Sequence, residues 1–172
     1  MNSQAILYPP GANDECHTPD YAVRALIPHL SPGLTYWCPF DEETSEFVVQ
    51  LKAAGLNVIW SHISAGMDFY QFDPGGWDVL VSNPPFTNKA KIFERVLSFG
   101  KPFALLMSLT WLNDSAPKRL FERRPLELLM FRERIQYKGQ ERKITFSSAY
   151  YCSGLLPKPI MFDSLKKYGM GQ

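Results

Sequence analysis

A short motif with two consecutive prolines is the first feature of this chain that could do chemistry. The apolar run Trp77–Val81 leads, after one serine, into Asn83, Pro84, Pro85 and Phe86. The prolines restrict φ and lack backbone donors, so the segment leaves the run in a rigid, extended form with free carbonyl acceptors. An amide oxygen and a carbonyl beside a flat ring suit a planar group that carries an NH2. The motif therefore predicts a binding site for such an amino group.

The amino nitrogen of a nucleobase fits this site chemically. It is a poor nucleophile, because its lone pair is delocalised into the ring. Two acceptors that hold its hydrogens favour a geometry in which the lone pair faces an electrophile, and enzymes reach such an atom by extruding the base onto an aromatic ring. The alternative is a proline-rich turn whose Phe86 fills the core. The position of the motif between an apolar strand and a lysine-rich helix favours the functional interpretation.

The order of apolar runs and amphipathic segments predicts an α/β protein that positions this motif. Strands are expected at 34–38, 57–60, 77–81, 103–109, 126–131 and 143–152. Helices are expected at 20–30, 42–54 and 89–98. The first four strands alternate with helices, whereas the last two follow closely around a turn at 138–140. We therefore predict a mostly parallel sheet that ends in an antiparallel hairpin, with helices on both faces and ligands at the carboxyl ends of the strands.

Composition limits the kind of protein further. The chain has 172 residues, 45% hydrophobic and 20% charged, which excludes a coiled coil or a disordered chain and predicts a single domain over 1–172. It has no apolar run of about 18 residues, so no membrane partner is expected. Its start lacks the pattern of a signal peptide, which predicts a cytoplasmic location, in the host if the protein is viral. The three cysteines fit neither a disulfide framework nor a metal site.

Charge is divided unevenly along the chain. Residues 1–86 carry two basic and ten acidic residues, whereas residues 87–172 carry sixteen basic and seven acidic ones. A basic half suggests a polyanionic partner, although a solvated surface explains such a charge run equally well. The residues that would contact nucleic-acid phosphates are Lys89, Arg123, Arg124, Arg132, Arg134, Lys138, Arg142 and Lys143.

The motif and its surroundings resemble the S-adenosylmethionine-dependent amino-methyltransferases, chiefly the N6-adenine class, over residues 17–152. The resemblance implies a Rossmann-like methyltransferase fold and S-adenosyl-L-methionine as the cofactor. Because NPPF is the catalytic motif of that family, it implies that Asn83 and the Pro84 carbonyl hold the target amino group. It also implies that Phe86 stacks on the target base.

The same resemblance implies which residues meet the methionine and adenine parts of the cofactor. Thr18 and Pro19 look like the segment that packs beside the methionine part. Asp68 and Phe69 look like the acidic pair, after the third strand region, whose aspartate meets the adenine amino group.

The first motif of the chain has no glycine and is similar to that of the EcoRI-type adenine methyltransferases. This similarity implies that Asp41 binds the methionyl ammonium, with Ser45 in the same loop. Ser61 and His62 stand where the family has an acid for the ribose hydroxyls. The hydroxyls are then either bound more weakly or contacted by His62 as a neutral donor and acceptor.

The length of the chain bears on the substrate. The catalytic core uses nearly all residues and leaves 156–172 as a C-terminal tail, so no separate target-recognition domain is expected. Adenine N6 in DNA, read with little sequence preference, is the first expectation, and a structured RNA is the alternative. Specificity could otherwise come from homodimerisation or a partner protein. The other class is a non-catalytic methyltransferase-like protein, of a compact bacteriophage type, that binds a host protein or nucleic acid.

Overall fold

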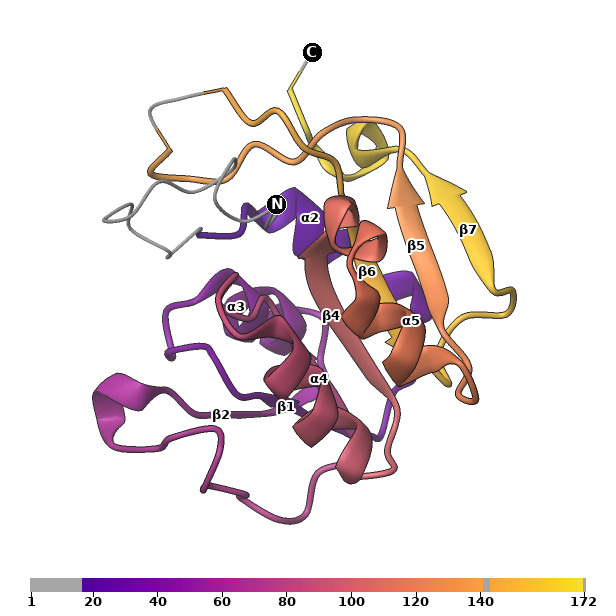
Figure 1. Cartoon of the computed structure of the whole chain (residues 1–172). Coiled ribbons are helices and arrows are strands. Elements are labelled where there is room, and N and C mark those ends of the chain that lie inside the picture. Colours follow the sequence, from indigo (N-terminus) through magenta and orange to yellow (C-terminus); the bar gives the residue numbers. More distant parts are fainter. Residues whose placement is uncertain (1–16, 141–142, 172) are drawn as a thin grey trace.

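The computed structural model describes residues 17–140 and 143–171, and within them it contains a seven-stranded sheet of order β2-β1-β3-β4-β6-β5-β7 (Figure 1). The strands are β1 (Thr35–Cys38), β2 (Asn57–Trp60), β3 (Val79–Ser82), β4 (Phe103–Ser108), β5 (Glu127–Phe131), β6 (Ser148–Ser153) and β7 (Ile160–Asp163). β1 to β4 pair in parallel, β6 runs antiparallel to β4 and β5, and β7 runs parallel to β5. The prediction of an α/β protein whose sheet combines parallel and antiparallel strands is confirmed.

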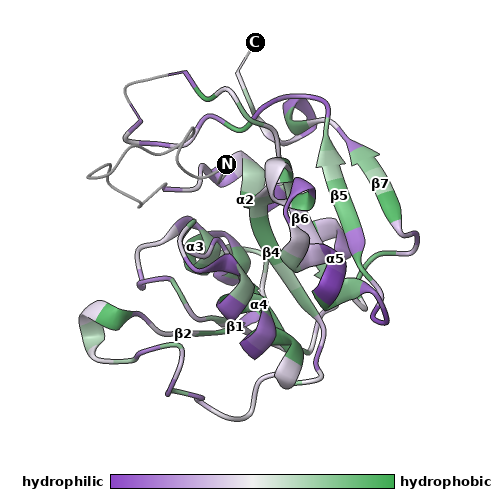
Figure 2. Ribbon diagram, viewed as in Figure 1, coloured by the Kyte–Doolittle hydropathy of each residue, from purple (hydrophilic) through white to green (hydrophobic). Residues whose placement is uncertain are grey.

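Helices cover both faces of this sheet. The α-helices of the described residues are α2 (Asp20–Arg24), α3 (Glu46–Ala53), α4 (Lys89–Ser98) and α5 (Ser115–Phe121). Alternate residues of a strand point to opposite faces, so Tyr36 packs in one core with α2 and α3, while Trp37 packs in the other with α4 and α5. The central strands are accordingly hydrophobic along their length (Figure 2). None of the described helices has the length and apolar character needed to cross a membrane.

Several element boundaries differ from the sequence-based predictions, and the helix predicted at 42–54 begins only at Glu46. The helix predicted at 20–30 stops at Arg24 and gives way to a 3-10 turn, η1 (Ile27–His29), because Pro28 has no amide hydrogen to continue an α-helix. The last predicted strand begins only at Ser148. Between β2 and β3 the chain forms the 3-10 turn η2 (Ile63–Ala65) within a loop, so the expected alternation with helices is interrupted there.

The prediction of a C-terminal tail from residue 156 is wrong. The chain instead adds β7 beside β5, with Leu128 opposite Ile160. It then forms the 3-10 turn η4 (Leu165–Tyr168) and returns to α2, where Arg24 Nη2 donates to the Tyr168 carbonyl at 2.8 Å. The sheet therefore ends in β7. β5 and β6 are antiparallel as predicted, but the loop 132–147 joins them in place of a tight turn at 138–140.

The path of the first three strands creates a crevice. The chain passes from β1 to β2 on one side and then crosses to β3 on the other side of β1. The segments that follow β1 and β3 therefore leave in opposite directions, and ligands of open α/β sheets bind at such a switch point. This edge carries the candidate site.

Candidate functional site

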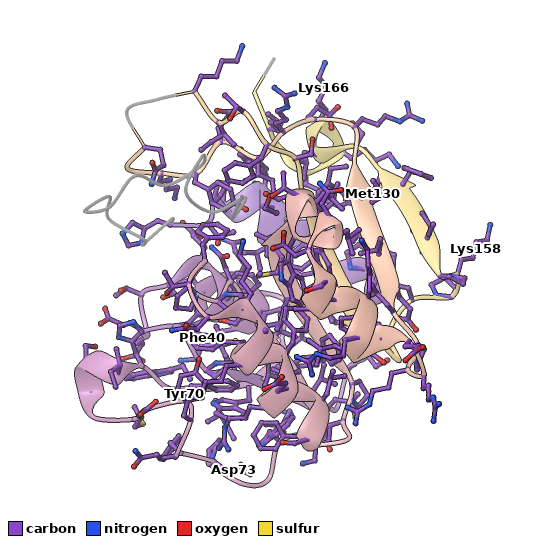
Figure 3. The ribbon with its side chains drawn as sticks, in the orientation of Figure 1. Phe40, Tyr70, Asp73, Met130, Lys158 and Lys166 are labelled. Carbon is purple, nitrogen blue, oxygen red and sulfur yellow. The ribbon has the colours of Figure 1, made fainter. Side chains whose placement is uncertain are left out.

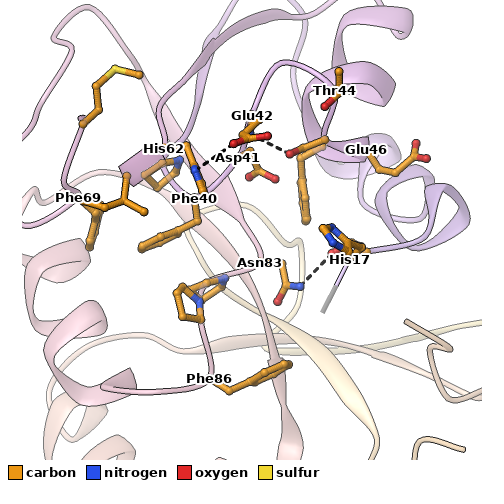
Figure 4. A pocket seen from close by; sticks show the side chains of 18 of the residues that line it. His17, Phe40, Asp41, Glu42, Thr44, Glu46, His62, Phe69, Asn83 and Phe86 are labelled. Carbon is orange, nitrogen blue, oxygen red and sulfur yellow. Dashed lines mark hydrogen bonds and ion pairs between the residues drawn. The ribbon is translucent and has the colours of Figure 1, made fainter. Parts of the chain in front are cut away.

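A cavity of about 750 Å³ lies at the carboxyl ends of β1, β2 and β3 (Figure 4). Its walls come from residues 39–47 after β1, residues 62–70 around η2, and residues 83–86 after β3. Residues 17–18 and Lys138 complete the lining. The volume lies in the range of about 300–1,000 Å³ that small-molecule and cofactor sites occupy. The fold thus gathers segments that are far apart in the sequence into one site.

Most of the predicted catalytic and cofactor residues line this cavity. They are Thr18, Asp41, Ser45, His62, Asp68, Phe69, Asn83, Pro84, Pro85 and Phe86. Two others lie outside the lining. Pro19 is buried at the N-terminus of α2, and Ser61 is buried with its Oγ accepting a hydrogen bond from Trp37 Nε1 at 2.9 Å. Both are therefore placed to support the walls and not to contact a ligand.

Asp41 is a buried carboxyl in the wall of the cavity. Ser82 Oγ donates to its Oδ2 at 2.5 Å, and its backbone amide donates to the Ser61 carbonyl at 3.3 Å. Burial raises the pKa of Asp41 to about 7, and the hydrogen bonds from Ser82 and Ser45 offset part of that rise. Among the described residues, no lysine, arginine or histidine forms an ion pair with this carboxyl. A cationic ligand in the cavity would therefore supply the missing counter-charge.

A hydrogen bond to Thr18 fixes the orientation of the Asn83 side chain. Its Nδ2 donates to Thr18 Oγ1 at 3.0 Å, which turns the amide oxygen away from Thr18 (Figure 4). That oxygen, Oδ1, is buried in this structure. An incoming amino group can therefore reach it only after a neighbouring segment moves. The hydrogen bond links two segments that the sequence separates by 65 residues.

Phe86 lines the cavity but belongs largely to the core, because only 2% of its surface is exposed. Tyr137 and Phe146 contact its ring edge-on, with centroid separations of 6.3 and 6.0 Å. Both neighbours come from the loop 132–147, so a base can stack on Phe86 only if that loop shifts. Lys89 is buried with its Nζ 5.7 Å from the centroid of the same ring. It does not lie on a surface that phosphates would contact.

An aromatic wall faces the cavity, and of its three residues only Phe69 was predicted from the sequence. Phe40, Phe69 and Tyr70 line it, and the centroids of Phe40 and Phe69 are 4.6 Å apart. Trp37 packs behind Phe69 at 5.8 Å and holds the wall in place. Such a wall suits a flat heterocycle. Phe40 directly precedes Asp41, so its position after the first strand was a usable signal.

The polar residues of the loop after β2 contact one another at the rim. His62 Nδ1 lies 2.7 Å from Ser64 Oγ and 3.4 Å from Glu42 Oε1, and Ser64 Oγ donates to the same carboxylate at 2.6 Å. Asp68 accepts from the backbone amide of Tyr70 at 2.9 Å. Asp68 was expected after a third strand region, but it lies in the loop between β2 and β3, where the described residues form no strand. His62 and Asp68 nevertheless share the cavity.

The predicted phosphate-binding residues fall into two groups on opposite edges of the sheet. Arg132 directly follows β5. The end of β5 lies at the same edge as the end of β4, since Met130 and Met107 both pair with Ala149 of β6. β4 is parallel to β3, so this is the edge that bears the cavity. Arg134, Lys138 and Lys143 lie in the loop that begins there. Lys138 lines the cavity, and its Nζ forms an ion pair with Glu46 at 2.8 Å.

Arg123 and Arg124 lie at the other edge. They precede β5. The start of β5 lies beside the start of β4, because Glu127 and Ala104 both pair with Cys152 of β6. They line a small pocket between α4 and α5. The structure therefore separates them from the cavity. Arg142 lies outside the described residues.

No protein-family model matches this chain, and no curated protein matches it either. A functional proposal therefore rests on the cavity and its side chains.

Proposed function

We propose that the protein transfers a methyl group from S-adenosyl-L-methionine to the exocyclic amino group of a nucleobase, with adenine N6 in DNA as the substrate. The observation that carries this proposal is the sharing of one cavity by the buried Asp41 carboxyl and by the segment Asn83–Phe86. The first feature suits a cationic small molecule, and the second suits a planar amino group. A fold of the Rossmann-like methyltransferase type is part of the proposal, supported by four parallel strands and by the antiparallel β6 between β4 and β5.

The lining fits the proposed cofactor in charge and shape. Asp41 would hold the methionyl ammonium, because its carboxyl lacks an ion-pair partner among the described residues. The aromatic wall of Phe40, Phe69 and Tyr70 would hold the adenine ring. His62 lies in the same cavity and can act as a donor or an acceptor toward the ribose hydroxyls. The cofactor supplies an electrophilic methyl group when it is bound.

The chain's own residues prepare the amino group. The Asn83 amide oxygen and the Pro84 carbonyl accept its two hydrogens, which turns the nitrogen lone pair out of conjugation with the ring. Thr18 keeps the amide in the orientation that this role requires, since its Oγ1 accepts from Asn83 Nδ2. No residue has to act as a strong base, because the nitrogen becomes acidic once it is methylated. The proton can then leave to water.

Two measurements test the proposal. Isothermal calorimetry with S-adenosyl-L-methionine is expected to give a dissociation constant of about 1–100 μM, and transfer of a labelled methyl group to adenine-containing DNA should follow. Asp41→Asn should abolish the binding heat, whereas Asp78→Asn removes a charge from an exposed residue outside the cavity and should leave it unchanged. The absence of heat with the native protein at millimolar cofactor would refute the proposal.

A further inference from the structure

The register of the sheet brings three chain segments to the edge that holds the cavity. β4 ends at Ser108, opposite the start of β6 at Ser148, and β5 and β7 end side by side at Phe131 and Asp163. The loop 132–147 therefore leaves this edge and returns to it. The segment after β7 also starts there. Figure 1 shows the loop and the C-terminal segment on the same side of the molecule.

The loop 132–147 is held against the cavity by buried anchors. Ile135, Tyr137, Ile144 and Phe146 are buried, and two of these residues contact Phe86. The Lys138 amide donates to the His17 carbonyl at 2.9 Å, which ties the loop to the segment before α2. While these apolar residues are buried, Arg132, Arg134 and Lys143 of the same loop are exposed to solvent.

Four cations of this edge are exposed and form no salt bridge within residues 17–140 and 143–171. They are Arg132, Arg134, Lys143 and Lys166. Neighbouring lysines differ in this respect, since Lys138 pairs with Glu46 and Lys167 pairs with Asp163 at 2.6 Å. Lys166 projects outward from η4, whereas Lys158 lies at the far end of β7 (Figure 3).

We propose that a DNA duplex lies along this edge, with phosphates contacting Arg132, Arg134, Lys143 and Lys166 while the target base enters the cavity. The proposal rests on the proposed function and adds to it the path of the polymer. It assigns a binding role to the C-terminal segment and withdraws that role from Arg123 and Arg124. The loop that carries most of these cations also covers Phe86. Contact with DNA can therefore be coupled to opening of the base site.

The spacing of the strands agrees with the dimensions of a duplex. At about 4.8 Å between strands, β5 is about 14 Å and β7 about 19 Å from β3, which leads into Asn83. With a rise of about 3.4 Å per base pair, these distances correspond to phosphates about four and six base pairs from the target base. Both distances are shorter than one helical turn of about 34 Å, so the edge is short enough for a single straight duplex to lie along it.

The sheet itself offers matched controls for an experiment. Arg123 and Arg124 precede β5 and Arg132 and Arg134 follow it, so the two double alanine variants remove the same charge from opposite edges. Lys158 and Lys166 flank β7 in the same manner. Fluorescence anisotropy with a labelled DNA duplex of about 20 base pairs, at salt concentrations of about 50–200 mM, gives the affinity and its salt dependence.

The double variant of Arg132 and Arg134 is expected to reduce the slope of log K against log salt by about 1.8, because each lost phosphate contact contributes about 0.9. Lys166→Ala should reduce it by about 0.9. The double variant of Arg123 and Arg124, and Lys158→Ala, should leave it unchanged.

The proposed surface would be refuted if the two double variants reduced the salt-dependence slope equally. It would also be refuted if the native protein showed no measurable DNA binding. A preference for an RNA duplex of the same sequence would overturn the assignment to DNA. Cofactor calorimetry on the same samples reports on the proposed function independently. Cofactor binding without an edge-specific effect would therefore refute only the surface, whereas absence of cofactor binding would refute the function.

Discussion

Stability and ligand binding are expected to oppose each other at Asp41. The pKa of this carboxyl rises from 3.8 to about 7 on folding, because burial disfavours its charged form. Between these values the folded state holds a proton that the unfolded state has released. The free energy of unfolding therefore falls as the pH rises through this interval. At about 1.36 kcal/mol per pH unit, the loss reaches about 4 kcal/mol at pH 8 and about 1.5 kcal/mol at pH 5.

Asp41→Asn removes this loss, because the amide matches the protonated carboxyl in size and does not ionise. The variant should therefore be more stable than the native protein, by about 1.5 kcal/mol at pH 5 and about 4 kcal/mol at pH 8. Guanidinium unfolding followed by tryptophan fluorescence measures both values. Other groups titrate as well, but their contributions are common to the two proteins and cancel in the difference. The same variant should lose affinity for S-adenosyl-L-methionine.

Two results would refute the reasoning. If the stability difference is the same at pH 5 and at pH 8, the carboxyl does not carry the cost of a buried charge. If the variant is stabilised as expected but binds the cofactor normally, Asp41 is not the partner of the ammonium group. Asp78→Asn serves as the control for removal of one negative charge, because Asp78 is exposed.

Four further outcomes follow from the site. Asn83→Ala should abolish methyl transfer while leaving cofactor affinity within about twofold in calorimetry, and equal loss of both would contradict its role. Thr18→Val should lower kcat about tenfold because Asn83 Nδ2 loses its acceptor, whereas Thr18→Ser should retain the rate. Cofactor affinity should increase about tenfold per pH unit up to about pH 7, since the ionised fraction of Asp41 does so; a flat profile below about pH 7 would count against this. Ser61→Ala should destabilise the fold by about 1–3 kcal/mol in denaturant unfolding, because Trp37 Nε1 loses its acceptor, without changing cofactor affinity.

Local patterns in the sequence were sufficient for much of the architecture. The predicted strand at 57–60 and helix at 89–98 agree with β2 and α4 at both ends. The position of Asn83 after an apolar strand was likewise predictable. These features depend on the spacing of apolar residues and on proline chemistry, which act over a few neighbouring residues.

Two features depended on the tertiary structure: the outermost strand β7, and the placement of the basic residues at opposite ends of the strands. β7 has four residues and is stabilised by parallel pairing with β5, so the sequence of 160–163 alone gives little sign of it. Arg124 and Arg132 are close in the sequence, yet they lie at opposite edges because a whole strand separates them.

The sequence by itself therefore determined which residue types could bind an amino group and a cofactor, since this depends on the chemistry of each side chain. The tertiary structure alone decided that Asp41 is buried and that Thr18 orients Asn83. It also decided that Tyr137 and Phe146 cover Phe86. Burial and contacts between distant segments arise only when strands pair and helices pack, and they set the pKa values and accessibility on which the proposed chemistry depends.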